Sequence, residues 1–141
     1  MTENKEIIVA LIAVFGVVLP YLFQRNKELK LKIAEQKREA YTSFLRNFNE
    51  AAVAVMRGEG DQGRDEDLDR MLARGQLMLY GSDDVVMAYD AWVRYGDLKE
   101  QDVSREGELV SLIFLAIRKD LLGKTKVTKD HIENLHPFNR G

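Results

Sequence analysis

The sequence predicts an all-α protein, in which one N-terminal transmembrane helix continues into a bundle of four helices and a short C-terminal helix. Three observations support this prediction. Residues 7–23, IIVALIAVFGVVLPYLF, contain no charged side chain. After them, apolar residues recur at steps of three and four, which is the period of a helix face. Alternation of apolar and polar residues, the signal of a strand, never extends beyond a few residues.

Residues 7–23 are long enough for a short membrane span. Seventeen residues form a helix of roughly 25 Å, against a hydrocarbon core of about 30 Å. A secretory signal peptide is disfavoured, because acidic residues precede the stretch and it ends in Tyr21, Leu22 and Phe23 rather than at a small-residue cleavage site. A buried core helix of a soluble protein stays open, since 17 residues is close to the length that separates the two classes.

The flanking charges predict an orientation. Six basic residues stand against three acidic ones between residues 24 and 40, whereas the residues before the span carry one basic side chain and two acidic ones. Because Lys and Arg concentrate on the cytoplasmic side, we expect an extracytoplasmic N-terminus (1–6), a transmembrane helix (7–23) and a cytoplasmic bundle domain (24–141). Membrane lipids are therefore expected partners, and four cations are candidate contacts with anionic headgroups: Arg25, Lys27, Lys30 and Lys32.

Gly16 and Pro20 are a candidate hinge within the span. Proline lacks an N–H, and its ring crowds the carbonyl of the residue four positions back, here Gly16. The alternative, a proline tolerated near a helix end, is favoured, because neighbouring groups can satisfy the freed carbonyl in transmembrane helices.

A long helix is expected to follow the span without a break. No Gly or Pro interrupts residues 28–57, and Tyr41, Leu45, Phe48 and Ala52 recur at helical spacing. Together with the span this predicts one continuous helix of about 50 residues.

Residues 59–69, EGDQGRDEDLD, are strongly acidic and are expected to lead into a second helix over 65–80. An acidic first turn is the favoured interpretation, because the helix dipole stabilises negative charge there, and a metal site is disfavoured. Leu68, Leu72 and Leu79 share one face of this helix, and Gly75 is expected to let another backbone approach closely. Five acidic residues are a candidate surface for a soluble protein partner: Asp61, Asp65, Glu66, Asp67 and Asp69.

Three further helices are expected. Gly81 should end the second helix, and Ser82 should cap a third, on which Trp92 is interpreted as a core residue rather than a ligand platform. A fourth helix contains the apolar run 109–117, should be central to the bundle, and should stop at Gly123. Thr128 is a plausible cap for a short fifth helix that Pro137 must end by His136.

The sequence does not argue for an enzyme. The chain has no cysteine, and its two histidines, His131 and His136, lie five apart in a tail expected to be exposed, which is the wrong spacing for a zinc pair on one helix face. No serine lies in an elbow motif, and the glycines near residue 60 form no phosphate loop. We expect no cofactor and no metal. Nucleic acid is also not an expected partner, because no basic patch stands out beyond the juxtamembrane stretch.

Three stretches carry a resemblance: KREAYTSFL (37–45), LMLYGSDDVVMAYDAW (77–92) and LAIRKDLLG (115–123). They resemble a set of small uncharacterised bacterial proteins with one N-terminal membrane helix and a cytoplasmic helical domain, which implies a place in the bacterial inner membrane. In plan only, the chain is also similar to the membrane accessory protein of type VI-B CRISPR systems, which implies a HEPN-like bundle. The nuclease pair of HEPN proteins is missing, because His131 follows Arg118 by thirteen positions.

Three functional hypotheses follow. The first is a non-enzymatic membrane protein that forms homo-oligomers through its span and bundle and forms a pore or perturbs the membrane, as the looser resemblance implies for phage defence. The second is an anchored adaptor, whose bundle binds a soluble protein partner. The third, an anchored nuclease or hydrolase, is the weakest. The sequence does not choose between the first two.

Overall fold

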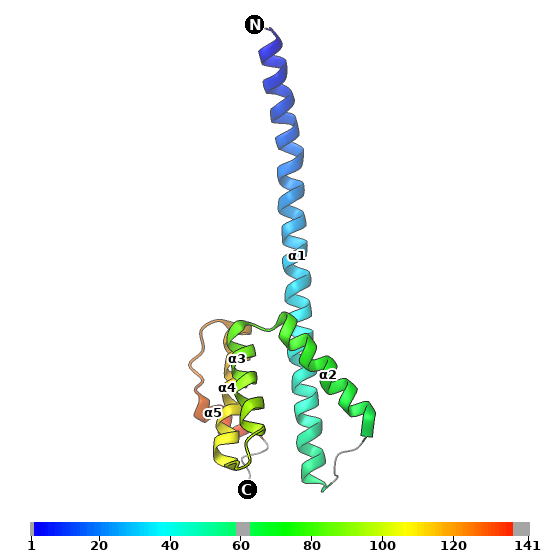
Figure 1. The fold of residues 1–141 in the computed structure, drawn as a ribbon. Coiled ribbons are helices and arrows are strands. Elements are labelled where there is room, and N and C mark those ends of the chain that lie inside the picture. Colours follow the sequence, from blue (N-terminus) through cyan, green and yellow to red (C-terminus); the bar gives the residue numbers. More distant parts are fainter. Residues whose placement is uncertain (1, 59–62, 137–141) are drawn as a thin grey trace. The chain divides into compact units, whose positions relative to one another are not determined.

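The computed structural model describes residues 2–58 and 63–136, with residues 63–67 described by their backbone only (Figure 1). Within these ranges helices are joined by turns and loops and no strand occurs, which confirms the all-α prediction. Two compact units make up the chain, Met1–Glu35 and Gln36–Gly141. The helices are α1 (Thr2–Met56), α2 (Gly63–Tyr80), α3 (Asp83–Gly96), α4 (Val103–Leu122) and α5 (Lys129–Leu135).

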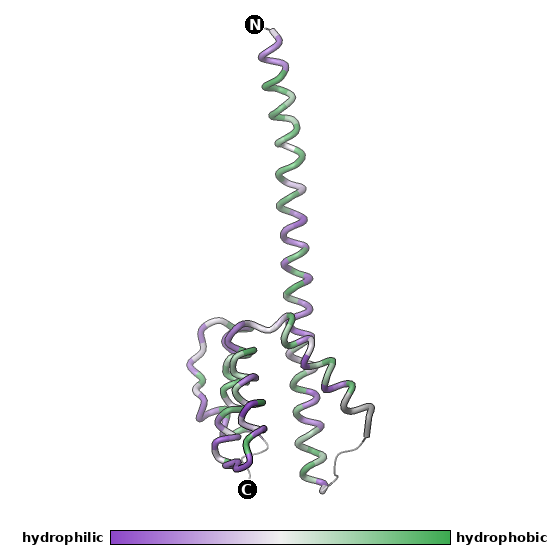
Figure 2. The backbone as a smooth tube through the Cα atoms, viewed as in Figure 1, coloured by the Kyte–Doolittle hydropathy of each residue, from purple (hydrophilic) through white to green (hydrophobic). Residues whose placement is uncertain are grey.

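The unit Met1–Glu35 is helical from Thr2 onward, as part of α1. Its apolar stretch is the long hydrophobic segment near the N-terminus in Figure 2. By length and composition, α1 is the one described helix that could cross a membrane, and no part of its most apolar window is buried within the chain. The 55-residue length of α1 agrees with the prediction of one continuous helix.

The core of the unit Gln36–Gly141 combines residues from four helices. α4 packs against both α3 and α5. The last turns of α1 contribute aromatic rings, of which Phe44 lies edge-on to Tyr89 of α3 and Phe48 lies edge-on to Phe114 of α4. The buried cluster consists of Tyr41, Phe44, Leu77, Val85 and Ile113.

Local signals set the helix ends where the sequence predicted them. The Ser82 hydroxyl accepts the Val85 N–H at 3.3 Å and caps α3. Gly123 ends α4 with a φ of 76°, a left-handed value that only glycine adopts without strain. Thr128 is the residue that precedes α5, and that helix ends at Leu135.

Tyr41 joins three helices through its hydroxyl. The hydroxyl donates to Asp120 Oδ2 of α4 at 2.6 Å and accepts the Ser82 N–H at 3.0 Å. Lys37 Nζ, one turn earlier on α1, lies 3.2 Å from the same Asp120 carboxylate. Burial, together with the hydrogen bond to Asp120, raises the pKa of Tyr41, because the phenolate would be desolvated beside a negative charge.

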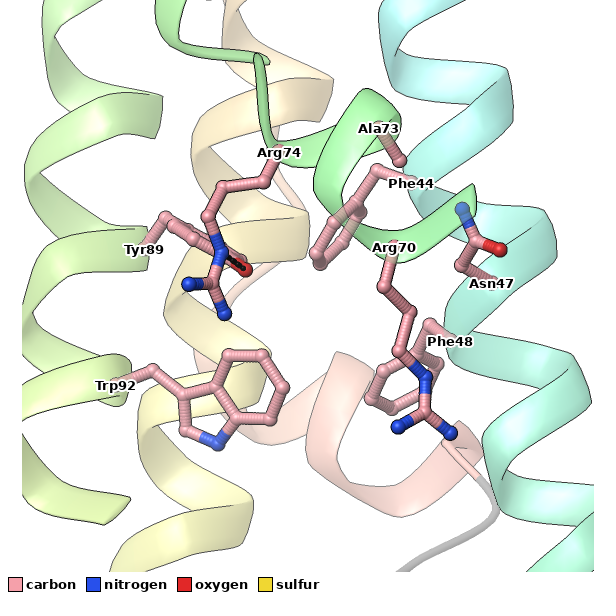
Figure 3. A pocket seen from close by; sticks show the side chains of 8 residues that line it. All are labelled: Phe44, Asn47, Phe48, Arg70, Ala73, Arg74, Tyr89 and Trp92. Carbon is pink, nitrogen blue, oxygen red and sulfur yellow. Dashed lines mark hydrogen bonds between the residues drawn. The ribbon is translucent and has the colours of Figure 1, made fainter. Parts of the chain in front are cut away.

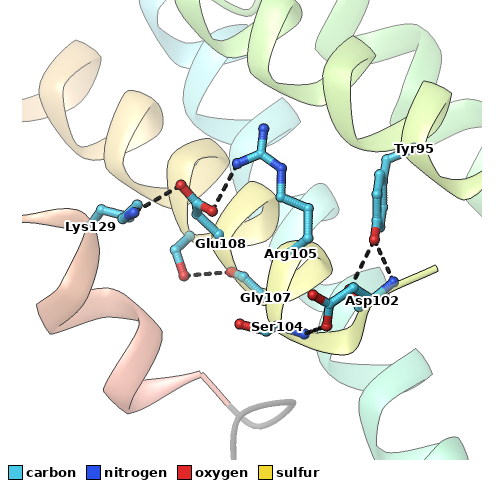
Figure 4. Close-up of polar contacts among 8 residues, drawn as sticks. Tyr95, Asp102, Ser104, Arg105, Gly107, Glu108 and Lys129 are labelled. Carbon is cyan, nitrogen blue, oxygen red and sulfur yellow. Dashed lines mark hydrogen bonds and ion pairs between the residues drawn. The ribbon is translucent and has the colours of Figure 1, made fainter.

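A second polar group fastens α5 to the start of α4 (Figure 4). The Glu108 carboxylate accepts from Lys129 Nζ at 2.9 Å and from Arg105 at 2.8 Å. The hydrogen bond from Lys129, followed by the one from Arg105, lowers the pKa of Glu108. In the turn before α4, the Tyr95 hydroxyl accepts the Asp102 N–H.

The sharp turn between α2 and α3 requires glycine at position 81, and a substitution there tests this. A Cβ placed on Gly81 would lie 2.5 Å from the Leu77 carbonyl oxygen, so the backbone would have to move. We expect Gly81→Ala to lower the free energy of unfolding by about 1–3 kcal/mol. The matched control is Gly75→Ala, where a Cβ meets nothing within 4 Å and helix propensity predicts a gain of about 0.5–1 kcal/mol. Chemical denaturation of both variants checks this, and equal effects at the two glycines would contradict it.

Candidate functional site

A cavity of about 250 Å³ lies between the C-terminal part of α1, α2 and α3. Figure 3 shows the side chains that line it. Four of them are aromatic, two are arginines, and the remaining two are small or amide residues: Phe44, Phe48, Tyr89, Trp92, Arg70, Arg74, Asn47 and Ala73. The combination of ring faces with guanidinium groups makes this cavity the leading candidate for a ligand site.

The aromatic walls support one another. The rings of Phe44 and Tyr89 cross at 84° with centroids 5.8 Å apart. Tyr89 and Trp92, one turn apart on α3, cross at 67° with the same separation. Edge-to-face pairs of this kind contribute about 0.5–1.5 kcal/mol beyond their buried area. The wall is therefore fixed by the same contacts that build the core.

Arg70 and Arg74 both come from α2, four residues apart, and their side chains extend in the same direction in Figure 3. Arg74 Nε donates to the Tyr89 hydroxyl at 3.1 Å, and its Cζ lies 5.8 Å from the centroid of the Tyr89 ring. Within the described part of the chain, no carboxylate forms an ion pair with Arg74. The guanidinium is thus held in place by a neutral partner and keeps its positive charge available.

The second feature is the apolar face of α2, which points outward. The sequence placed Leu68, Leu72 and Leu79 on one face of this helix, and that face is the exposed one. Ala73 and Leu77, on the opposite side, are the residues that α2 buries. We name the outward residues the α2 face: Leu68, Met71, Leu72, Gly75, Met78 and Leu79.

The expectation of a close backbone approach at Gly75 is wrong within this chain. A Cβ at Gly75 would meet nothing within 4 Å. The physical reason is the direction in which α2 packs, because Leu77 enters the core and Gly75, half-buried, lies on the other side of the helix. Gly75 lies midway along the exposed face, with Leu72 before it and Leu79 after it.

The predicted membrane residues all lie on α1. Gly16 and Pro20 are exposed and helical, and a Cβ at Gly16 would meet nothing within 4 Å. Four cations that follow the apolar stretch 7–23 are exposed: Arg25, Lys27, Lys30 and Lys32.

The acidic surface can be followed only in part. Asp61 lies outside the described residues. Asp65, Glu66 and Asp67 fall in the first turns of α2, as the sequence predicted, but only their backbone is described. Asp69 is exposed and lies beside Arg70 at a small hollow that also involves Glu50.

The two histidines have different environments. His131 is exposed, and its Nδ1 accepts the Thr128 N–H at 3.0 Å. His136, expected to be exposed, is buried at 5% exposure, with Nε2 3.2 Å from the Gly107 carbonyl oxygen. That expectation is wrong, because the chain after α5 packs the imidazole against Gly107 of α4. Among the described residues, no group of three His, Asp or Glu side chains could hold a metal ion.

Sequence reasoning missed the cavity. The available signal was the pair Arg70 and Arg74 beside the small residue Ala73. The sequence could not show that these residues of α2 line one cavity with Trp92 of α3.

The chain matches no protein-family model, no curated protein and no solved structure. Any conclusion about function therefore depends on the contacts, burial and charges of the residues in this chain.

Proposed function

We propose that this protein is a non-enzymatic, single-span membrane protein that self-associates through the α2 face. The observation that carries the proposal is the exposure of five Leu and Met side chains on one side of a helix whose other side is buried. Leu68 is 57% exposed and Leu79 is 77% exposed. A contiguous apolar surface of this kind usually marks an interaction site.

The α2 face fits a second copy of itself. Gly75 stands at its centre, with apolar residues three and four positions away on both sides. If two α2 helices cross antiparallel at Gly75, Leu and Met residues of one copy meet Leu and Met residues of the other. A two-fold interface requires this self-complementarity, and a glycine at the crossing point allows the two backbones to come close.

The proposed topology follows the charges and the apolar stretch. The span holds the domain at the cytoplasmic face of a bacterial inner membrane, with the N-terminus outside. The exposed cations after the span attract anionic headgroups by about 1 kcal/mol each near the surface. Self-association through the two-fold α2 interface would bring two spans together. Contacts between the spans, with Gly16 and Pro20 as the candidate hinge, would extend such pairs into the larger assembly that a membrane pore or perturbation requires.

Charge substitution in the α2 face tests the proposal. We expect Leu72→Glu and Leu79→Glu to weaken self-association of the full-length protein at least tenfold, because each buries a carboxylate against an apolar partner surface. Light scattering in mild detergent across a concentration series measures the mass. Leu122→Glu is the matched control, since Leu122 is 62% exposed on α4 and should leave the mass unchanged. A monomeric wild-type protein, or an unchanged mass for Leu72→Glu, would refute self-association through α2.

An anchored adaptor is the second candidate function. It is favoured by Asp69, which is exposed at the edge of the α2 face. In this case the face binds a soluble protein with apolar and basic residues. A monomeric wild-type protein whose specific capture of such a partner is lost in Leu79→Glu would support the adaptor over the oligomer.

A further inference from the structure

We propose that the cavity between α1, α2 and α3 binds a small planar aromatic anion, with the ring against Trp92 and the phosphate or carboxylate held by Arg74. This inference is independent of self-association, because the cavity lies on the side of α2 that faces the core. Nothing in the proposed membrane function requires it.

The size of the cavity limits the ligand. Its volume of about 250 Å³ falls just below the range of about 300–1,000 Å³ typical of drug-sized ligands. One ring system with a single acidic group is therefore the expected scale. Mononucleotides and aromatic carboxylic acids share this chemistry, and the experiment below distinguishes them.

The walls favour a planar ring. Trp92 and Tyr89 are half-buried and present ring surface to the cavity from α3, while Phe44 presents its ring from α1. Aromatic rings pack well against such walls in offset or edge-on arrangements. An aliphatic chain would fill the space without using these geometries.

The charge favours an anion. Arg74 donates one N–H to the Tyr89 hydroxyl, which orients the guanidinium and leaves its two terminal nitrogens for a ligand. A guanidinium matches the bidentate geometry of a phosphate or carboxylate. Arg70 also lines this wall, but the charge argument depends on Arg74. An uncharged ligand could accept a hydrogen bond from Arg74, but it would lack the charge attraction that strengthens such a bond.

Trp92 provides a direct readout, since it is the only tryptophan in the chain and lines the cavity. The full-length protein in mild detergent is titrated with AMP, GMP, CMP and UMP in one arm, and with phenylacetate and benzoate in the other. Tryptophan fluorescence is followed with red-edge excitation, and equilibrium dialysis with radiolabelled ligand confirms the binding. A saturable change is expected in at least one arm, and the arm that responds identifies the ligand class.

Two substitutions at Arg74 test whether its guanidinium holds the acidic group of the ligand. Arg74→Gln should weaken binding at least tenfold, and Arg74→Lys should weaken it less, because lysine keeps the charge but loses the bidentate geometry. The matched control is Arg94→Gln on α3, since Arg94 is exposed, pairs with Asp90 and does not line the cavity. This control should bind as the wild-type protein does. Absence of saturable binding in both arms, or equal affinity in Arg74→Gln and wild type, would overturn the proposal.

Discussion

Replacement of Leu77 by alanine is expected to lower the free energy of unfolding of the unit Gln36–Gly141 by about 2–5 kcal/mol. Leu77 is 1% exposed and is the residue through which α2 joins the buried cluster. Alanine would remove most of its apolar contact and leave a void among Tyr41, Val85 and Ile113. Urea denaturation of the full-length protein in mild detergent, followed by Trp92 fluorescence, measures the change.

Leu79→Ala is the matched control for this prediction. It is the same substitution on the same helix, two residues further on, but Leu79 is 77% exposed. Its effect on the unfolding of the unit should stay within about 0.5 kcal/mol when it is measured at protein concentrations too low for self-association. Equal losses for the two leucines would mean that α2 does not pack as described.

The second large effect is expected at Tyr41. Tyr41→Phe removes the hydroxyl that donates to Asp120 and accepts the Ser82 N–H, and it leaves both groups without that partner. A lost hydrogen bond to a charged group costs about 1.5–3 kcal/mol. We therefore expect a loss of this size at neutral pH, measured by the same denaturation experiment. Tyr80→Phe is the control. Tyr80 is half-buried, and its hydroxyl forms no hydrogen bond with the described residues.

Tyr41 should also make the free energy of unfolding fall at alkaline pH. Its folded-state pKa is raised above the ordinary value, so above about pH 10 the unfolded chain releases the phenol proton while the folded chain keeps it. The unfolded state then binds fewer protons, and stability falls as pH rises. The contribution is fully present below about pH 10 and is lost as pH rises through the folded pKa. Tyr41→Phe should show a shallower decline above pH 10 than wild type, and parallel curves for the two proteins would contradict this.

The core and the cavity share residues, which links stability to binding. Phe44 belongs to the buried cluster and also lines the cavity, and Tyr89 packs against that cluster while it holds Arg74. A ligand that binds only the folded state stabilises it by mass action. Binding at Arg74 would therefore be visible as a higher denaturation midpoint as well as in the fluorescence of Trp92.

The sequence by itself determined the helices and most of their ends. Ser82 caps α3 and Gly123 ends α4, and both were predicted because caps and stops depend on a few neighbouring residues. The apolar stretch 7–23 was predicted in the same way, since the absence of charge over 17 residues is a local property. The identity of the α2 residues on one face was also correct, because helical spacing fixes it.

Only the tertiary structure decided which face of each helix is covered. Apolar residues lie on two sides of α2. Leu77 packs against residues from α1, α3 and α4, so the side with more Leu and Met residues points outward. His136 is buried against Gly107, 29 positions earlier, and the cavity is lined by rings and guanidinium groups from three helices. Such features arise from contacts between residues far apart in the chain, and those contacts leave no signal in the local spacing of residue types.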